Sequence, residues 1–337
     1  MWQAFSFAFN AVVPMLLLMC LGYWLKQKHV FEGETLDKIN WFAFKILLGM
    51  MAFNNVYKLK DITSIPINLM CVAIVILLGL TAFGAMLGKL VTNDNRQRGV
   101  LVQCAFRSNY NVMGIALATE LGGVAGAGVS ATLMAPVVLY YNIIAVVVLS
   151  IYGMGGLDSV DLKKLMSTVF HNSIIVGLLI GIGCLAIRSI LPVGADGTPI
   201  FLLSRDIPWV YAVISDLAKI APPLLLILLG ATVNFSKIGD IKKMLTITVI
   251  MRLILAPIIG FTIAFGAQKL GIISIDNAVL ATLVGMLATP SPVISAPMAA
   301  EAGCDGELAS QNVVWTTTLS MITLMFIIMS LKYAGIM

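Results

Sequence analysis

Long apolar stretches alternate with short polar segments along the whole chain. A helix needs about 20 predominantly apolar residues to cross the hydrocarbon core of a bilayer. Ten stretches meet this requirement, and we number them one to ten: about 4–26, 37–57, 66–90, 99–120, 128–152, 170–190, 209–232, 244–269, 277–300 and 309–333. The pattern therefore predicts an all-α membrane protein with ten transmembrane helices.

Composition supports a membrane protein with little room for a soluble domain. Hydrophobic residues make up 60% of the chain and charged residues only 11%, whereas a soluble domain carries about 25% charged residues. The first charged residue, Lys26, follows a long apolar run. We interpret that run as a first span rather than a cleaved leader. Neither the five cysteines nor the two histidines show metal-binding spacing, so we expect no metal and no cofactor.

The loops indicate an orientation. Loops after odd-numbered spans hold more lysine and arginine than loops on the opposite side. The positive-inside rule then places both termini on the non-cytoplasmic side of a plasma (inner) membrane. The net charge of +5 is explained by these loops and requires no nucleic-acid partner.

Two segments suggest an internal repeat. "MGIALATELGG" at 113–123 aligns with "ISAPMAAEAGC" at 294–304, which places Glu120 opposite Glu301. This alignment maps span four onto span nine. Five spans per half is an odd number, so the second half is expected to be inverted in the membrane. We predict a single transporter unit with repeats at 1–152 and 168–337, although small-residue membrane helices also resemble one another by chance.

Spans four and nine are both interrupted. Span nine contains Pro290, Pro292 and Pro297, and each proline removes a backbone donor and clashes with the preceding turn. Span four has a polar centre at 107–111 followed by Gly114, which tolerates non-helical backbone. Freed backbone groups inside a bilayer must find partners, and a half-helix that begins after a break offers its positive end to an anion. Two such breaks that meet predict an anion site.

Arg107 lies in the middle of span four, where an arginine costs roughly 2.5–3.5 kcal/mol. Its guanidinium can bind a carboxylate through two parallel hydrogen bonds. Contact with a substrate, pairing with another protein group and snorkelling to the membrane surface remain open alternatives for it. Asn142 lies in mid-span five and needs partners if it is buried.

Other charged residues have simpler interpretations. Asp216 and Lys219 share a face of span seven and can pair. Lys45 and Arg252 lie near predicted cytoplasmic ends, so we expect both to snorkel. The sequence contains no phosphate-binding GxxxxGK[ST], no HExxH and no Ser/His/Asp set, which favours a protein that is not an enzyme.

Several segments in order resemble one known family. They are "GYWLKQKHVF", "AFRSNYNVMGIALA", "HNSIIVGLLIGI", "DLAKIAPPLLLILLGATV", "RLILAPIIG" and "LATPSPVISAPMAAEAGCDGELAS". Over nearly its whole length the chain resembles the auxin efflux carrier family, including its bacterial malate- and malonate-permease-like members. Gly49, Ala116 and Ser173 stand where relatives have proline. Span three lacks the acid and base of the plant members, which weakens a proton-coupling role for that span.

The resemblance implies a bile-acid-symporter-like fold and an elevator mechanism. Spans one, two, six and seven would form a scaffold, and spans three to five and eight to ten a mobile transport domain. Spans four and nine would cross near the carboxylate of an organic anion. Asn109 would be the asparagine of the crossing, Tyr141 or Asn142 would contact the substrate from span five, and Asp216 matches an aspartate common in plant members.

These considerations together predict a secondary transporter of small carboxylates such as malate or malonate. The candidate helix breaks are Gly114, Pro290, Pro292 and Pro297, and the candidate coupling residues for a proton or sodium ion are Asp216, Glu120 and Glu301. The expected partners are the organic anion, the lipid bilayer and a second copy of the chain. The alternatives are a sodium-coupled symporter of larger organic anions and a membrane sensor that binds an anion without transporting it. The candidate substrate-binding residues are Arg107, Ser108, Asn109, Asn111, Tyr141, Asn142, Ser291 and Ser295.

Overall fold

The computed structural model describes residues 2–31, 33–58, 67–156, 162–192, 200–232 and 238–336, and all regular structure in these ranges is helical. Five helical segments within them are long and apolar enough to cross a membrane: Ile67–Val91, Asn95–Gly153, Pro208–Thr232, Gly239–Lys269 and Gly306–Tyr333. Shorter apolar helices occupy Val12–Gln27, Ser173–Arg188 and Asn277–Leu287. The prediction of an all-helical, apolar protein is therefore confirmed, and the number of crossings stays a prediction.

Five predicted spans are single helices, and neither Pro14 in the first span nor Pro222 and Pro223 in the seventh breaks the helix. They are α1 (Trp2–Gln27), α4 (Ile67–Val91), α8 (Ser173–Ile190), α10 (Pro208–Thr232) and α15 (Gly306–Tyr333), which correspond to spans one, three, six, seven and ten. Two short helices, α7 (Leu162–Phe170) and α9 (Leu203–Asp206), lie between the predicted spans.

Two other predicted spans contain a widened π-helical turn. Such turns often occur at functional sites. The turn η1 carries Lys45, and the turn η5 carries Arg252. Span two consists of α2 (Gly33–Phe42), η1 (Ala43–Leu47) and α3 (Leu48–Tyr57), and span eight of α11 (Ile238–Ile250), η5 (Met251–Leu255) and α12 (Ala256–Lys269).

Spans four and nine are both broken, and Pro290 and Pro292 lie in the break of span nine. The predictions for the other two break residues are wrong, because Pro297 lies within the helix Ser295–Glu301 and Gly114 ends the π-helical turn Tyr110–Gly114. Each first half begins at an aspartate whose side chain accepts a backbone hydrogen bond, Asp94 from Arg96 N and Asp276 from Val279 N, as a helix N-cap does. The helix α6 (Ile115–Gly153) contains the end of span four and the whole of span five. The two parts are joined by a kink at Gly123, which has a φ of 61°. Span four comprises α5 (Asn95–Phe106), η2 (Tyr110–Gly114) and the start of α6 (Ile115–Gly153), and span nine comprises α13 (Asn277–Leu287) and α14 (Ser295–Glu301).

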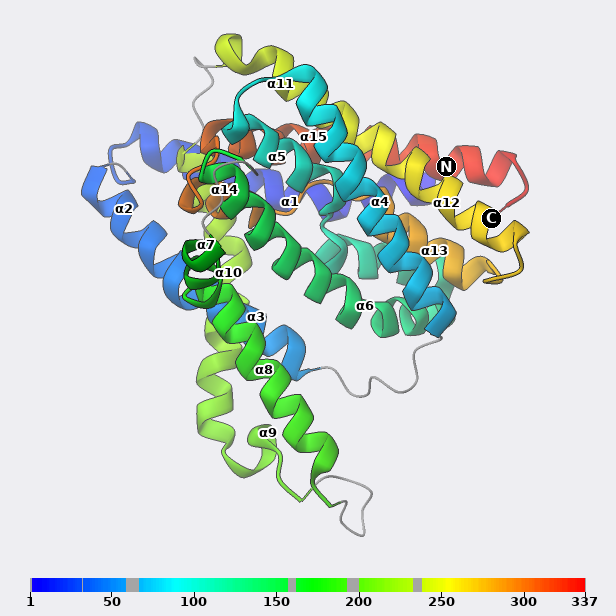
Figure 1. The fold of residues 1–337 in the computed structure, drawn as a ribbon, viewed down its shortest axis with the longest axis horizontal. Coiled ribbons are helices and arrows are strands. Elements are labelled where there is room, and N and C mark those ends of the chain that lie inside the picture. Colours follow the sequence, from blue (N-terminus) through cyan, green and yellow to red (C-terminus); the bar gives the residue numbers. More distant parts are fainter. Residues whose placement is uncertain are drawn as a thin grey trace.

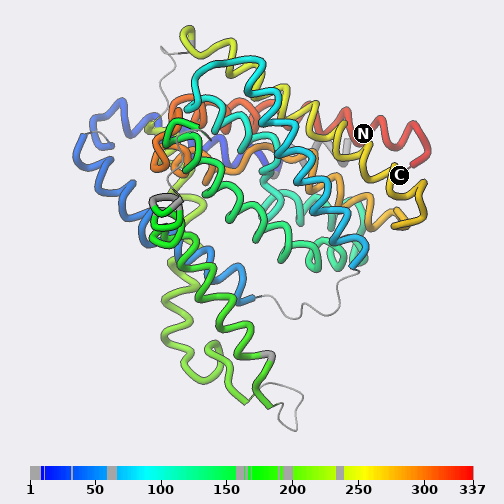
Figure 2. Tube along the Cα trace, viewed as in Figure 1, coloured from blue at the N-terminus to red at the C-terminus, as the bar shows by residue number. Residues whose placement is uncertain are grey.

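The helices pack in two groups, which are joined where α1 packs against α15. α3 packs against α8 and α10, and α1 packs against α10. α4 packs against α5 and α12, while α6 packs against α13. In Figure 1, α3, α8 and α10 extend away from the larger body that contains α4, α6, α12 and α13. The Cα trace in Figure 2 shows the yellow-to-red last third of the chain running through the same body as the cyan and green segment 67–153, so both broken spans belong to that body.

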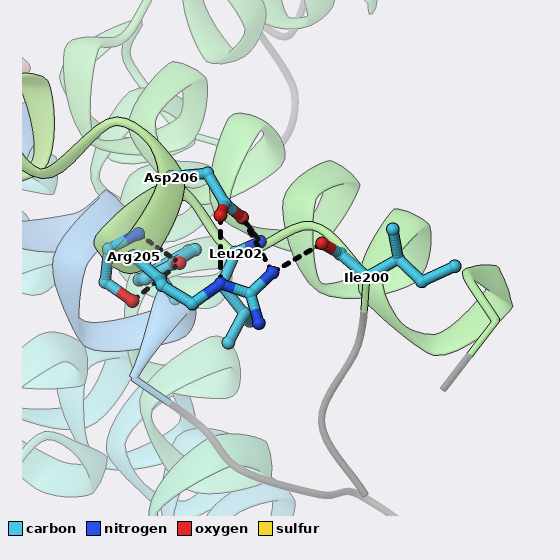
Figure 3. A network of polar contacts seen from close by, with 6 residues as sticks. Ile200, Leu202, Arg205 and Asp206 are labelled. Carbon is cyan, nitrogen blue, oxygen red and sulfur yellow. Dashed lines mark hydrogen bonds and ion pairs between the residues drawn. The ribbon is translucent and has the colours of Figure 1, made fainter. Parts of the chain in front are cut away.

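A polar turn fixes the start of α10. The carboxylate of Asp206 accepts hydrogen bonds from Leu202 N at 2.6 Å and from Arg205 Nε at 2.9 Å. Arg205 also donates to the carbonyl of Ile200, and Figure 3 shows the three interactions together. The bonds from Arg205 and then from Leu202 hold the pKa of the Asp206 carboxyl below its ordinary value. The turn is thus a local clamp ahead of α10.

Candidate functional site

The two broken spans touch at their breaks. Asn109 N donates to the carbonyl of Pro290 at 2.8 Å. A Cβ on Gly285 would lie 2.3 Å from the carbonyl oxygen of Gly114, and a Cβ on Gly114 would lie 2.6 Å from that of Gly285. The chains of η2 and α13 therefore cross in direct backbone contact, which only glycine at both positions permits.

Arg252 satisfies the carbonyl groups that the breaks leave free. Its Nη1 donates to the carbonyl oxygens of Cys104 at 3.4 Å and Ala105 at 3.2 Å, near the end of α5. Its Nη2 donates to the carbonyl of Leu287, the last residue of α13. The side chain is 0% exposed, so the prediction that Arg252 snorkels is wrong. The unpaired carbonyls at two helix ends explain why an arginine is buried there.

Arg107 is buried beside the crossing and faces span five. Its Nη1 donates to the carbonyl of Tyr141 at 3.1 Å and contacts Met298 Sδ at 3.2 Å, while its Nη2 donates to Asn142 Oδ1 at 2.9 Å. The residue is 4% exposed, which excludes snorkelling. Within the described ranges Arg107 forms no ion pair with a carboxylate, and its Nε has no hydrogen-bond partner.

A cavity of about 240 Å³ lies against this face of the crossing. Ser108 and Tyr141 share a hydroxyl–hydroxyl hydrogen bond of 2.9 Å in its wall. Asn54, Asn55 and Lys58 from the end of α3, with Lys219 from α10, complete the polar lining. The cavity is also lined by six of the eight predicted binding residues: Arg107, Ser108, Asn109, Asn111, Tyr141 and Asn142.

The two predicted serines of span nine lie elsewhere. Ser291 Oγ accepts from Asn312 Nδ2 at 2.9 Å, and Ser291 N donates to Thr316 Oγ1 at 3.2 Å, so Ser291 is held against α15. Ser295 Oγ is buried and has no hydrogen-bond partner among the described residues. Neither serine lines the cavity. The structure thus separates them from Arg107, whereas Pro292 from the same break does line the cavity.

The three candidate coupling carboxylates lie outside this cavity. Glu301 forms an ion pair with Lys45 at 2.8 Å, which joins α14 to η1. The prediction that Lys45 snorkels missed this ion pair. Asp216 pairs with Lys219 at 3.0 Å on the exposed side of α10, and Glu120 is exposed close to the reversal in α6.

Four polar residues of the lining were missed from the sequence as parts of one site. We expected Lys219 to pair with Asp216, and we expected no binding role for Asn54, Asn55 or Lys58, because they lie at the end of span two. A signal was present, since two adjacent amides precede a lysine at the end of span two. The described lining now holds three cations, Arg107, Lys58 and Lys219, and no carboxylate, while Lys219 is paired with Asp216, which does not line the cavity. Such a cavity suits an anion.

Comparison with known proteins agrees with the fold. A family model described as "Membrane transport protein" matches residues 7–155 and 157–328, which makes this chain a multi-pass membrane transporter. It belongs to the auxin efflux carrier family, as the match across its length shows. A search of curated proteins finds no match. The malate-permease-like subtype stays a prediction.

Proposed function

We propose that this protein is a secondary carrier of small organic anions such as malate or malonate, and that it binds a substrate carboxylate in the cavity at the crossing. The observation that carries the proposal is the composition of that cavity. Arg107, Lys58 and several amides line about 240 Å³ together with Lys219, whose charge is paired with Asp216, and no described lining residue is acidic. A small dicarboxylate would neutralise part of this charge on binding.

Arg107 is the proposed carboxylate ligand. Its Nε is unpaired within the described part of the chain, and its bonds to Tyr141 and Asn142 hold the guanidinium plane against span five. Charge-assisted hydrogen bonds between a guanidinium and a carboxylate are among the strongest in proteins. The helical run η2–α6 begins at Tyr110, directly after the cavity residues Ser108 and Asn109, so its positive end adds to the attraction.

Movement of one helix group against the other would give alternating access. The cavity is lined by residues from η2 and α6 and by residues from α3 and α10. A second cavity of about 580 Å³ lies between η1, α10 and α14 and is lined by Lys45, Pro297 and Glu301 among others. We propose α1–α3, α8 and α10 as the scaffold, and α4–α6 with α11–α15 as the moving body of an elevator.

Matching contacts support two inverted repeats at 1–152 and 168–337. A Cβ on Gly177 of α8 would lie 2.1 Å from the carbonyl oxygen of Gly49 of span two. A Cβ on Gly230 of span seven would lie 1.9 Å from the carbonyl oxygen of Met19 of α1. Spans one and six therefore each meet the partner repeat in backbone contact, and both broken spans begin at an aspartate cap.

Transport by the purified protein in liposomes tests the proposal. Mono- and dicarboxylates would be applied to proteoliposomes on a solid-supported membrane, and radiolabelled counterflow would detect electroneutral exchange. We expect flux of a small dicarboxylate that Arg107→Met abolishes. Arg96→Met is the control, because Arg96 is exposed and remote from the cavity. Undiminished flux in the Arg107 variant, with folded protein, would contradict the site.

A further inference from the structure

Arg252 occupies an unusual position for a charged side chain. It belongs to the π-helical turn η5, is completely buried, and donates only to backbone carbonyls. Those carbonyls come from the ends of two separate half-helices, Cys104 and Ala105 from α5 and Leu287 from α13. Both half-helices point their negative ends at this one guanidinium.

The same kind of oxygen environment holds a coupling cation in many secondary transporters. Carbonyls of unwound segments and the carboxyl ends of half-helices coordinate Na⁺ or H⁺ near the substrate site. A sodium ion at such a place supplies one positive charge and satisfies carbonyls that have lost their helical partners. The guanidinium of Arg252 supplies both, and it stays protonated at any physiological pH.

We propose that Arg252 is a built-in cation that replaces a coupling sodium ion at the crossing, so that anion transport by this protein needs no sodium. The inference rests on the proposed function and specifies its coupling. Arg252 is a positioning residue, because it does not line the cavity and acts by holding the ends of α5 and α13 beside Arg107. Its charge is not cancelled by an ion pair with any described carboxylate.

Two other buried side-chain oxygens are available to a cation. Ser295 Oγ and Asn312 Oδ1 are buried and unpartnered among the described residues. Both are neutral oxygens, and the nearest candidate carboxylate in that half-helix, Glu301, is paired with Lys45. A sodium effect that depends on Ser295 and Asn312 is therefore the outcome that would oppose the proposal.

The first experiment compares cations on the wild-type protein. Thermal unfolding of the purified full-length protein would be recorded in NaCl, KCl and choline chloride at equal ionic strength, and anion uptake in proteoliposomes in the same salts. We expect the same Tm and the same uptake rate in all three. A sodium-specific rise in Tm of several degrees, or an uptake rate at least tenfold lower without sodium, would overturn the proposal.

The second experiment removes the charge. Arg252→Lys keeps a cation, while Arg252→Ala leaves a space that millimolar methylguanidinium can fill. We expect the lysine variant to unfold at a higher temperature than the alanine variant, and methylguanidinium to raise the Tm of Arg252→Ala but not that of the wild type. Equal stability of both variants, or no response to methylguanidinium, would count against a cationic role.

The two proposals fail in different ways. Thermal unfolding requires no substrate, so it decides the role of Arg252 even if no tested anion is transported. If either Arg252 variant fails to fold, a sodium requirement in the wild-type comparison of salts would still overturn the proposal. Sodium-dependent uptake of a dicarboxylate would leave the proposed function standing and reject the built-in cation.

Discussion

Two buried arginines lie at the same helix crossing, and their surroundings differ. Arg252 donates to three backbone carbonyls at helix ends and does not line the cavity. Arg107 donates to one carbonyl, one amide side chain and one thioether, and it lines the cavity. Backbone acceptors cannot leave without breaking a helix, whereas side-chain acceptors can give way to a ligand. From this difference we propose a framework role for Arg252 and a binding role for Arg107.

The largest effect is expected from a substitution that forces the two crossing backbones apart. Gly285→Ala would place a Cβ 2.3 Å from the carbonyl oxygen of Gly114, which displaces both arginines together. We expect a loss of about 3 kcal/mol in stability, as severe overpacking causes, seen as a lower midpoint in thermal unfolding. Gly266→Ala is the matched control, because a Cβ there meets no atom within 4 Å. Equal stability of the two variants would show that the backbones do not touch.

The variant Arg107→Met distinguishes the roles of the two arginines most directly. Loss of a hydrogen bond to a charged group costs about 1.5–3 kcal/mol, so we expect substrate affinity to fall at least about tenfold. The framework held by Arg252 should remain folded. Binding measured by titration, together with thermal unfolding, checks both halves. A variant that keeps its affinity but unfolds at a much lower temperature would reverse the two assignments.

Asn142→Ala should have a smaller effect. The amide oxygen of Asn142 accepts from Arg107 Nη2 at 2.9 Å, and its removal leaves the guanidinium less well oriented. We expect a loss of about 1 kcal/mol in binding, or roughly fivefold in Kd. Asn277→Ala, at the start of α13 and away from the cavity, is the control. An increase in affinity would mean that Asn142 competes with the substrate for Arg107.

Glu301→Gln should change stability by less than about 1 kcal/mol. Its partner Lys45 lies 2.8 Å away, but the two side chains are 39% and 33% exposed, and such pairs contribute little. The pair joins η1 of the proposed scaffold to α14 of the proposed moving body. We therefore expect a changed transport rate at nearly unchanged Tm. A large fall in Tm would instead place the pair within the framework.

The smallest effect is expected at Asp206, in the turn ahead of α10, and concerns the dependence of stability on pH. Hydrogen bonds from Arg205 and Leu202 lower the pKa of Asp206 from its ordinary value of 3.8. Its stabilising contribution is therefore complete above that value and is lost as the pH falls through the lower folded-state pKa. Comparison of the thermal unfolding of wild type and Asp206→Asn should show a difference at neutral pH that narrows in acid. A difference that grows in acid would contradict the lowered pKa.

The breaks were predictable from sequence, because prolines and a polar run interrupt apolar segments. The polar centre of span four also identified four residues of the cavity lining, Arg107, Ser108, Asn109 and Asn111. The role of Arg252 could not be predicted, because its acceptors Ala105 and Leu287 lie on two other helices, far along the chain. Because Arg252 lies near a predicted span end, the sequence indicated only that its side chain snorkels to the membrane surface. A buried arginine that caps helix ends is visible only after the helices are placed.

The same limit explains the other differences. Ser291 and Ser295 share the proline-rich break with Pro292, but a break does not determine which side chains turn toward α15 and which toward the cavity. The contributions of Asn55 and Lys58 depend on where the end of α3 packs. Sequence spacing carries no information on that packing, because α3 reaches the crossing through tertiary contacts alone.

The most direct test of the account is the binding of a small dicarboxylate to the purified protein. Malate and malonate would be titrated into the wild type, Arg107→Met and Arg96→Met, each shown by thermal unfolding to be folded. The account predicts saturable binding to the wild type and to Arg96→Met, and binding at least about tenfold weaker to Arg107→Met. Equal affinity for all three proteins would contradict a carboxylate site at Arg107.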